Sequence, residues 1–315
     1  MNILFTSVGR RVELLQEFKS SANRLGVKLN IYGSDITNTA PALAFCDKVN
    51  FLPKISDEHY IPTLLELCSN EHIDLLIPTI DTDLLLLSEN KKHFEANGTK
   101  VMVSEHDKIQ ICRDKNVTFE FLRDCGLNAP QTVRNYSEYT GDYPCFIKPK
   151  DGSSSIDAFK VDNADELKVY AEHIKDYVIQ PFVFGEEYTV DVFCDFCGNP
   201  IYITPRKRLA VRAGEVLKTE ICQDKEIIDE VKMLISHFKP CGPITIQLIR
   251  NSEGEDYYIE INPRFGGGAP LSMKAGANSA EAVLRILSGE HFEYEENAAD
   301  NGAVFCRYDQ SVRVK

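Results

Sequence analysis

Several features that define other protein classes are missing from this 315-residue chain. No apolar run is longer than a few residues, which excludes a membrane-spanning helix. Positive charge is in deficit, because 35 Lys and Arg residues stand against 48 Asp and Glu residues and leave a net charge of −13. An acidic surface repels nucleic-acid phosphate and anionic lipid, so we expect neither nucleic acid nor a membrane as a partner.

The first residues also lack the basic-then-apolar pattern of a secretory leader, and we therefore expect a cytoplasmic protein. The ten cysteines are not expected to form disulfides in that reducing compartment. Most stand singly among apolar residues, where a free cysteine behaves as a small hydrophobe. One CxxC pair, Cys194 and Cys197, lacks the second Cys or His pair that a zinc site needs, so we interpret it as structural.

What the chain does have is the composition of a folded protein, with 43% apolar and 26% charged residues. At roughly 150 residues per domain, its length predicts about two domains. The first hundred residues alternate strand and helix patterns, with strands expected at 2–7, 28–32, 74–80 and 100–104. Such alternation predicts a mostly parallel, Rossmann-like sheet covered by helices on both faces.

A dinucleotide site is not expected in this half. The first strand is followed by a single glycine, whereas the dinucleotide fingerprint needs three at fixed offsets. Arg10 and Arg11 at the next helix start could bind an anion or could be solvated. Asp81 and Asp83 follow the third strand, where open sheets place their ligands, and could be capping residues or substrate contacts. The sequence leaves both choices open.

From residue 107 the pattern changes to α+β. A helix is expected over 107–125, and a linker follows it at Pro130. Turn signals at 198–199 and 252–254 predict hairpins and therefore antiparallel pairs. Further strands are expected at 145–149, 156–161, 177–181, 187–194, 201–205, 216–222, 244–250, 257–261 and 303–308, with helices at 163–175, 224–238 and 279–289.

The strongest chemical signal is the segment YYIEINPRFGGG, residues 257–268. Side chains alternate along an extended strand, so Glu260 and Asn262 share one face. Ile259 and Ile261 are expected to pack behind that face. A carboxylate beside an amide oxygen at a strand end suits a hard divalent cation such as Mg²⁺.

Neighbouring residues strengthen this signal. A hairpin through Gly254 would bring Gln247 alongside Glu260. Arg264 follows two residues after Asn262 and could reach phosphates that such a cation binds. The alternative is the polar face of a half-exposed strand, which is common in sheets.

A second signal is FIKPKDGSSS, residues 146–155. Lys148 protrudes from an apolar strand, and a loop of Gly152 and three serines follows it. Backbone amides and hydroxyls of such a loop can close over phosphate, and a lysine beside it supplies the counter-charge. Lys115, on the preceding helix, could add another. Taken alone, each lysine could equally be a solvated charge.

A third signal is VIQPFVFGEEYTVDVF, residues 178–193. A strand that carries Gln180 leads into Phe182 and Val183, whose backbone groups could hydrogen-bond an adenine edge. Glu187 on the next strand could accept a hydrogen bond from a ribose hydroxyl. Without the other signals this segment would be interpreted as a turn.

In this order, the three segments resemble the ATP-grasp superfamily, and most closely the synthetase halves of the carbamoyl-phosphate synthetase large subunit. Biotin carboxylase and the D-alanine–D-alanine ligases are more distant relatives. The resemblance covers nearly the whole chain. It implies an α/β N-terminal domain over residues 1–106 and an α+β ATP-grasp domain over 107–315, with a small lid subdomain at about 130–183.

The resemblance also implies ATP and Mg²⁺ as cofactors, with two metal sites and Mn²⁺ as a substitute. Arg264 and Lys148 match its catalytic cations. The positions that match metal ligands are Gln247, Glu260 and Asn262. The positions that match nucleotide contacts are Lys115, Lys148, Gly152, Ser153, Ser154, Gln180, Phe182, Val183 and Glu187. The chain departs from the family in its phosphate loop, where Gly152 is the single glycine.

The activity implied by the resemblance is ATP-dependent ligation of a small-molecule carboxylate to an amine or similar nucleophile, through an acyl-phosphate. The alternative is a nucleotide-binding module without turnover inside a larger assembly. Residues 205–215 are the most basic stretch of an acidic chain, and Arg206, Arg208 and Arg212 could hold a substrate carboxylate or phosphate. This stretch could also be a solvated loop. A homodimer is a further expectation.

Overall fold

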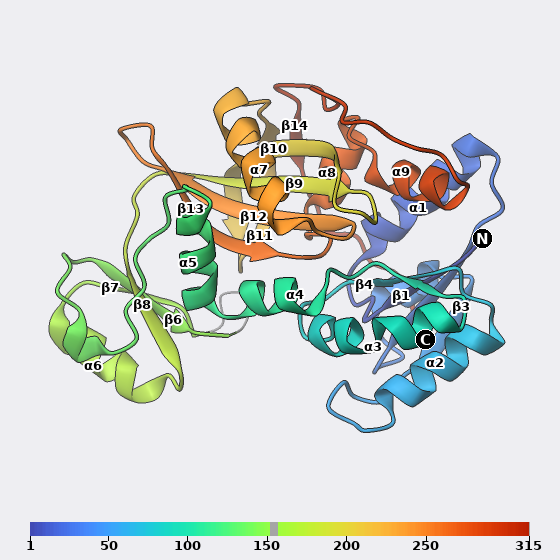
Figure 1. The fold of residues 1–315 in the computed structure, drawn as a ribbon, viewed down its shortest axis with the longest axis horizontal. Helices are drawn as coiled ribbons and strands as arrows, with labels where there is room; N and C mark the ends of the chain where they lie inside the picture. The colour runs from blue at the N-terminus through green and yellow to red at the C-terminus, as the bar shows by residue number, and fades with distance from the viewer. Residues whose placement is uncertain (152–156, 315) are drawn as a thin grey trace.

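The computed structural model describes residues 1–151 and 157–314. Figure 1 shows three sheets, an N-terminal one in blue, a small one in green and a large one in yellow to orange. Ten cysteines lie in this part of the chain and all are free, as expected. None of the helices described is long and apolar enough to cross a membrane.

The N-terminal sheet is parallel throughout, in the strand order β3-β2-β1-β4-β5, which confirms the prediction. Its strands are β1 (Asn2–Thr6), β2 (Asn30–Asp35), β3 (Lys48–Phe51), β4 (Leu75–Pro78) and β5 (Lys100–Val101). The connecting helices are α1 (Val12–Leu25), η1 (Pro41–Phe45), α2 (Tyr60–Asn70) and α3 (Leu84–Ala96). Both faces are buried, because Ile3 and Phe5 of β1 pack with α1 while Leu4 packs with α2 and α3.

The helix expected over 107–125 is two helices, α4 (His106–Arg113) and α5 (Lys115–Asp124). Asp114 between them has extended backbone angles, and its side chain accepts a hydrogen bond from the Asn116 N–H. Asp114 therefore caps the second helix, a competing local interaction that a helical periodicity does not reveal.

The small sheet follows, with antiparallel order β7-β6-β8. Its strands are β6 (Cys145–Pro149), β7 (Phe159–Val161) and β8 (Tyr177–Pro181), and its helices are η2 (Tyr136–Glu138) and α6 (Ala164–His173). A separate apolar core beneath it includes Cys145, Ile147 and Leu167. The small sheet thus has a core of its own.

The large sheet is antiparallel, in the order β13-β12-β9-β10-β11-β14. Its strands are β9 (Glu186–Cys194), β10 (Pro200–Arg212), β11 (Glu215–Ile221), β12 (Pro243–Arg250), β13 (Asp256–Asn262) and β14 (Val304–Cys306). The two expected hairpin turns are present, between β9 and β10 and between β12 and β13. Its helices are α7 (Lys225–Phe238), α8 (Ala269–Lys274) and α9 (Ser279–Leu287).

Strand β10 is longer than expected. The sequence predicts a strand that ends at residue 205, whereas β10 continues to Arg212 and pairs with β11 along this extension. Residues 205–212 of the basic stretch are therefore strand and not loop, although residues 209–215 are exposed to solvent. Arg206, Arg208 and Arg212 would share one face of a regular strand, but the register shifts between Arg208 and Val211. A bulge of this kind changes which face the later side chains occupy, and a run of positive charge does not show it.

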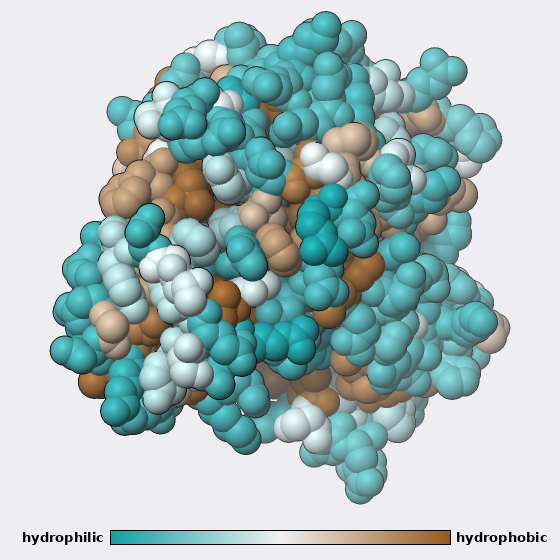
Figure 2. All heavy atoms as spheres, turned by 60° about the vertical axis from the view of Figure 1, so that its left-hand side comes forward, coloured by the Kyte–Doolittle hydropathy of each residue, from teal (hydrophilic) through white to brown (hydrophobic). Residues whose placement is uncertain are grey.

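The N-terminal sheet and the end of the chain share one hydrophobic core. Helix α1 packs against α8 and α9, and Phe18 contacts Phe265 edge to face with ring centroids 6.2 Å apart. The predicted boundary near residue 106 falls at the first residue of α4, and the domain limits stay a prediction. The surface drawn in Figure 2 is largely hydrophilic, as the charge of the chain leads us to expect.

Candidate functional site

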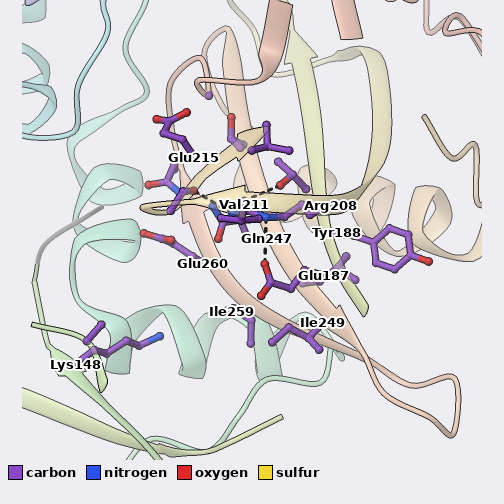
Figure 3. A pocket seen from close by; sticks show the side chains of 18 of the residues that line it. Lys148, Glu187, Tyr188, Arg208, Val211, Glu215, Gln247, Ile249, Ile259 and Glu260 are labelled. Atoms are coloured by element: carbon purple, nitrogen blue, oxygen red, sulfur yellow. Dashed lines mark hydrogen bonds and ion pairs between the residues drawn. The ribbon is translucent and has the colours of Figure 1, made fainter. Parts of the chain in front are cut away.

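One cavity of about 700 Å³ lies where the three sheets meet. The N-terminal sheet contributes Arg11 and Asp81, the small sheet contributes Lys148 and Gln180, and the large sheet supplies most of the remaining wall. Figure 3 shows the long strands of the large sheet carrying many of these side chains toward one another. A cavity of this size is typical of sites for small molecules and cofactors.

The predicted hairpin brings the candidate metal ligands together. Gln247 of β12 stands directly opposite Glu260 of β13, and Thr245 stands opposite Asn262. Gln247, Glu260 and Asn262 all line the cavity. The pairing of Gln247 with Glu260 is therefore confirmed.

One neighbour of these residues is placed differently from the prediction. Ile261 packs in the core, but Ile259 lines the cavity beside Glu260. The register shifts here, since Gln247 faces Glu260 while Leu248 faces Tyr258. The extra residue is a β-bulge, which lets two successive side chains face the same side. Simple alternation could not predict it.

Arg264 lies in the turn after β13 and links the large sheet to the N-terminal one. Its Nη2 is 2.7 Å from the Asp81 carboxylate and 3.3 Å from the Asn262 side-chain oxygen. Asp81 lines the cavity together with Arg264, and a contact of Asp81 with substrate stays a prediction. Asp83 is different, because it is fully buried and accepts hydrogen bonds from Thr6 and Tyr60.

Two lysines approach the cavity from α5 and β6. Lys148 is only 8% exposed, and burial lowers its pKa to about 8, with the nearby Lys115 acting in the same direction and Glu260 opposing it. Burial also lowers the pKa of Lys115, which donates to the Lys150 carbonyl at 3.3 Å. Both lysines line the cavity. Gly152, Ser153 and Ser154 lie outside the described residues.

The segment that joins β8 to β9 forms another wall. Gln180 is buried, and its side-chain amide donates to the Pro130 carbonyl at 3.3 Å. Phe182 and Val183 follow it, and all three line the cavity. Glu187 lies 3.1 Å from the Arg208 guanidinium and faces the same space.

The three arginines of the basic stretch have three different environments. Arg206 is 1% exposed, and its Nε lies 2.6 Å from the Asp191 carboxylate, which also accepts from Ser272 at 2.6 Å. Arg208 joins Glu187 at the cavity wall. Arg212 pairs with Asp309 near the chain end at 3.2 Å and does not belong to the lining residues of the described chain.

Two further charged residues, Arg11 and Glu215, line the cavity. The sequence allows Arg11 either to bind an anion or to be solvated; in the structure it lines the cavity, and its Nη2 donates to the Thr79 carbonyl at 2.9 Å. Glu215, the last residue of the basic stretch, also lines the cavity, and sequence reasoning did not identify it as a site residue. A single carboxylate next to arginines in the sequence does not predict a site residue, because its position in the cavity depends on the fold.

The donor set of the candidate metal site fits Mg²⁺ in kind. Glu260 supplies a carboxylate, and Gln247 and Asn262 supply amide oxygens, which are the hard ligands that Mg²⁺ takes. No group of three or more His, Cys, Asp or Glu side chains suited to a metal occurs in the described residues. A cation here would therefore complete its shell from water or from phosphate oxygens, as Mg²⁺ usually does.

Comparisons with known proteins agree with this geometry. Residues 3–102 match the family described as "PylC-like, N-terminal domain", and residues 112–268 match the family described as "ATP-grasp domain". The D-alanine--D-alanine ligase B of Clostridium perfringens is 24% identical over 242 residues, covering 67% of this chain and 80% of its own.

The N-terminal section of the carbamoyl phosphate synthase large chain of Aquifex aeolicus is 26% identical over 289 residues. That match covers 81% of this chain and spans 51% of the relative. The biotin carboxylase domain dimer of Hydrogenobacter thermophilus 2-oxoglutarate carboxylase, solved with MgADP, ADP and bicarbonate, has a TM-score of 0.75. It is 17% identical and covers 96% of this chain and 73% of its own, a likeness of fold.

Proposed function

Because the chain belongs to the ATP-grasp family and carries a PylC-like N-terminal domain ahead of its ATP-grasp domain, we propose that it is an ATP-dependent ligase. It joins a small-molecule carboxylate to an amine or a related nucleophile. The observation that carries the proposal is the pairing of Gln247 with Glu260 in the cavity that also holds Lys148 and Arg264.

Each part of the cavity has a role in this proposal. Gln247, Glu260 and Asn262 hold Mg²⁺, and Lys148, Lys115 and Arg264 offset the negative charge that develops during phosphoryl transfer. ATP supplies the γ-phosphoryl group that activates the carboxylate as an acyl-phosphate, which the nucleophile then displaces. Gln180, Phe182, Val183 and Glu187 hold the adenosine part. The family resemblance assigns Gly152, Ser153 and Ser154 to contacts with the ATP phosphates.

The environment of Lys148 supports this assignment. A nearly buried ammonium loses the stabilisation of water, and burial indeed lowers its pKa. A triphosphate beside Lys148 would stabilise the ammonium in place of water, because it would accept a charge-assisted hydrogen bond from it. A merely structural lysine at this position has no such reason to face a cavity.

Further parts of the proposal are two cation sites, replacement of Mg²⁺ by Mn²⁺, and a homodimer. The relative solved as a dimer supports the last of these. The ten free cysteines fit the cytoplasm as the working compartment.

The test is release of ADP from ATP and Mg²⁺ while candidate carboxylates and amines are added in pairs. We expect at least one pair to stimulate release, and Glu260→Gln to lower that rate by about a hundredfold or more, because charge stabilisation at the transferring phosphoryl is lost. Glu253→Gln, in the exposed turn between β12 and β13, is the matched control and should leave the rate unchanged. Nucleotide binding without any stimulated release would favour a binding module instead.

A further inference from the structure

The cavity contains charged groups beyond those that the proposed function uses. Lys115, Lys148, Glu187 and Glu260 belong to the half assigned to nucleotide and metal. At the other end the lining includes Arg206, Glu215 and the turn of Gly266, Gly267 and Gly268. Figure 3 shows Glu215 and Lys148 at opposite sides of the drawn cavity, with Glu260 between them. This second end is where a substrate other than nucleotide would lie.

At this end of the cavity, Arg206 has one N–H group, at Nη1, that makes no hydrogen bond within the described residues. Its Nε and Nη2 are 2.6 and 3.3 Å from the two carboxylate oxygens of Asp191, so the guanidinium is fixed in place. Its Nη1 is buried and has no hydrogen-bond partner among the described residues. Buried donors are normally satisfied, and a 1% exposed guanidinium that lines a cavity is a built site for an anion.

Glu215 provides the opposite charge. Its side chain is 58% exposed, it lines the cavity, and its Oε2 lies 3.2 Å from Arg307 Nη1. Arg307 comes from the segment just after β14 and also lies 3.4 Å from Glu13 of α1. A cation from the chain's own end thus already contacts the Glu215 carboxylate, which shows that this position accepts a positive group.

The glycine turn fixes the spacing of the two groups. A Cβ on Gly267 would meet a Glu215 carboxylate oxygen at 2.3 Å, and a Cβ on Gly268 would meet Arg206 Nη2 at 2.7 Å. The carboxylate and the guanidinium therefore lie over adjacent residues, whose Cα atoms are about 3.8 Å apart. No ion pair joins Arg206 to Glu215 in the described parts of the chain, because Arg206 pairs with Asp191 and Glu215 pairs with Arg307.

We propose that this end of the cavity binds a zwitterionic α-amino acid, whose ammonium group contacts Glu215 and whose carboxylate contacts Arg206. Ammonium and carboxylate are separated by one carbon in such a molecule, which matches groups held over adjacent glycines. The absence of side chains at Gly267 and Gly268 lets the Glu215 carboxylate and the Arg206 guanidinium lie directly against the backbone of this turn. The inference rests on the proposed function and names the class of one of its substrates.

The test is isothermal titration of the full chain with each of the twenty standard L-amino acids and D-alanine, in the presence of Mg²⁺ and a non-hydrolysable ATP analogue. We expect at least one to bind. Its α-hydroxy analogue lacks the ammonium, and its carboxamide lacks the carboxylate, and each should bind about tenfold or more weakly because a charged hydrogen bond is lost.

A substitution of Glu215 tests the contact with the ligand ammonium from the protein. Glu215→Gln should weaken the amino acid by about tenfold or more, while the ATP analogue binds as before. Glu220→Gln is the matched control, because Glu220 lies on the same strand, β11, but does not belong to the described lining of the cavity. It should bind the amino acid as the unaltered protein does.

Three results would overturn the inference. They are a protein that binds the nucleotide analogue but none of the amino acids, analogues that bind as well as the amino acid, and an unchanged affinity in Glu215→Gln. The proposed function fails separately, through absence of nucleotide binding or of ADP release with every carboxylate. If carboxylates without an amino group stimulate ADP release while no amino acid binds, the proposed ligase activity is supported and the proposed amino-acid site is contradicted.

Discussion

At the scale of single residues, the proposed function depends on charged side chains that are buried in the cavity wall, above all Lys148. Lys148 is nearly inaccessible, and its pKa of about 8 lies below the ordinary lysine value because burial disfavours the ammonium. The sequence could indicate that this lysine stands among apolar neighbours, in Phe-Ile-Lys-Pro. It could not give the depth of burial, which arises from strands that are distant in sequence.

This pKa predicts a pH-dependent affinity for nucleotide. The folded-state pKa is lowered, so the ammonium is present at pH 7 and is lost as the pH rises through about 8. We expect the dissociation constant of a non-hydrolysable ATP analogue to increase about tenfold between pH 7 and pH 9. Lys148→Arg keeps its charge over this range and should remove the dependence. Titration calorimetry at several pH values checks both, and equal profiles would contradict the role of Lys148.

A second residue prediction concerns the buried pair of Arg206 and Asp191. Asp191→Leu leaves a 1% exposed guanidinium without its carboxylate, and breaking such a pair costs about 3–5 kcal/mol. We expect that loss in the free energy of unfolding measured with urea. The double variant Asp191→Leu, Arg206→Met removes both charges and should lose much less. A single variant as stable as the parent protein would show that the pair is not buried as described.

At the scale of elements, patterns of alternation predicted most strands but not their irregularities. The β12–β13 hairpin followed from a turn signal at 252–254, and it correctly paired Gln247 with Glu260. The bulge that turns Ile259 toward the cavity and the extension of β10 to Arg212 were both missed. Bulges and strand ends depend on partners across the sheet, which a local pattern does not contain.

The break between α4 and α5 gives a prediction of its own. Asp114→Ala removes the cap of α5 and should lower stability by about 1 kcal/mol. Because Lys115 is the first residue of α5 and lines the cavity, we expect weaker binding of the ATP analogue as well. Asn163→Ala removes the equivalent cap of α6 and is the control. It should reduce stability similarly while leaving nucleotide affinity alone, and a matching loss of affinity would contradict the account.

At the scale of the whole molecule, helix α1 near the start of the chain shares one core with α8 and α9 near its end. The change from alternating to antiparallel patterns near residue 107 predicted two kinds of sheet, and both are present. Sequence patterns did not show that α8 and α9 share a core with α1, or that Arg264 pairs with Asp81. Arg264 and Asp81 are 183 residues apart, and α1 lies still farther from α8 and α9 along the chain, so a local sequence pattern does not reveal these contacts.

This shared core predicts that residues 107–315 will not fold stably alone. Without α1, side chains such as Met273, Val283 and Leu284 lose part of their burial, and each large apolar side chain exposed costs about 1.5–3 kcal/mol. We expect the separated fragment to lack the cooperative thermal unfolding of the full chain, as followed by near-UV circular dichroism. Cooperative unfolding at the midpoint of the full chain would show that the core is not shared.

The central claim is that a carboxylate in this cavity accepts the γ-phosphoryl group of ATP. The most direct measurement uses a stimulating carboxylate labelled with ¹⁸O, followed by mass spectrometry of the phosphate released during turnover. The account predicts that one labelled oxygen passes from the carboxylate to phosphate, and that Glu260→Gln abolishes the transfer together with turnover. Phosphate released without label, by a protein that turns over the labelled carboxylate, would contradict it.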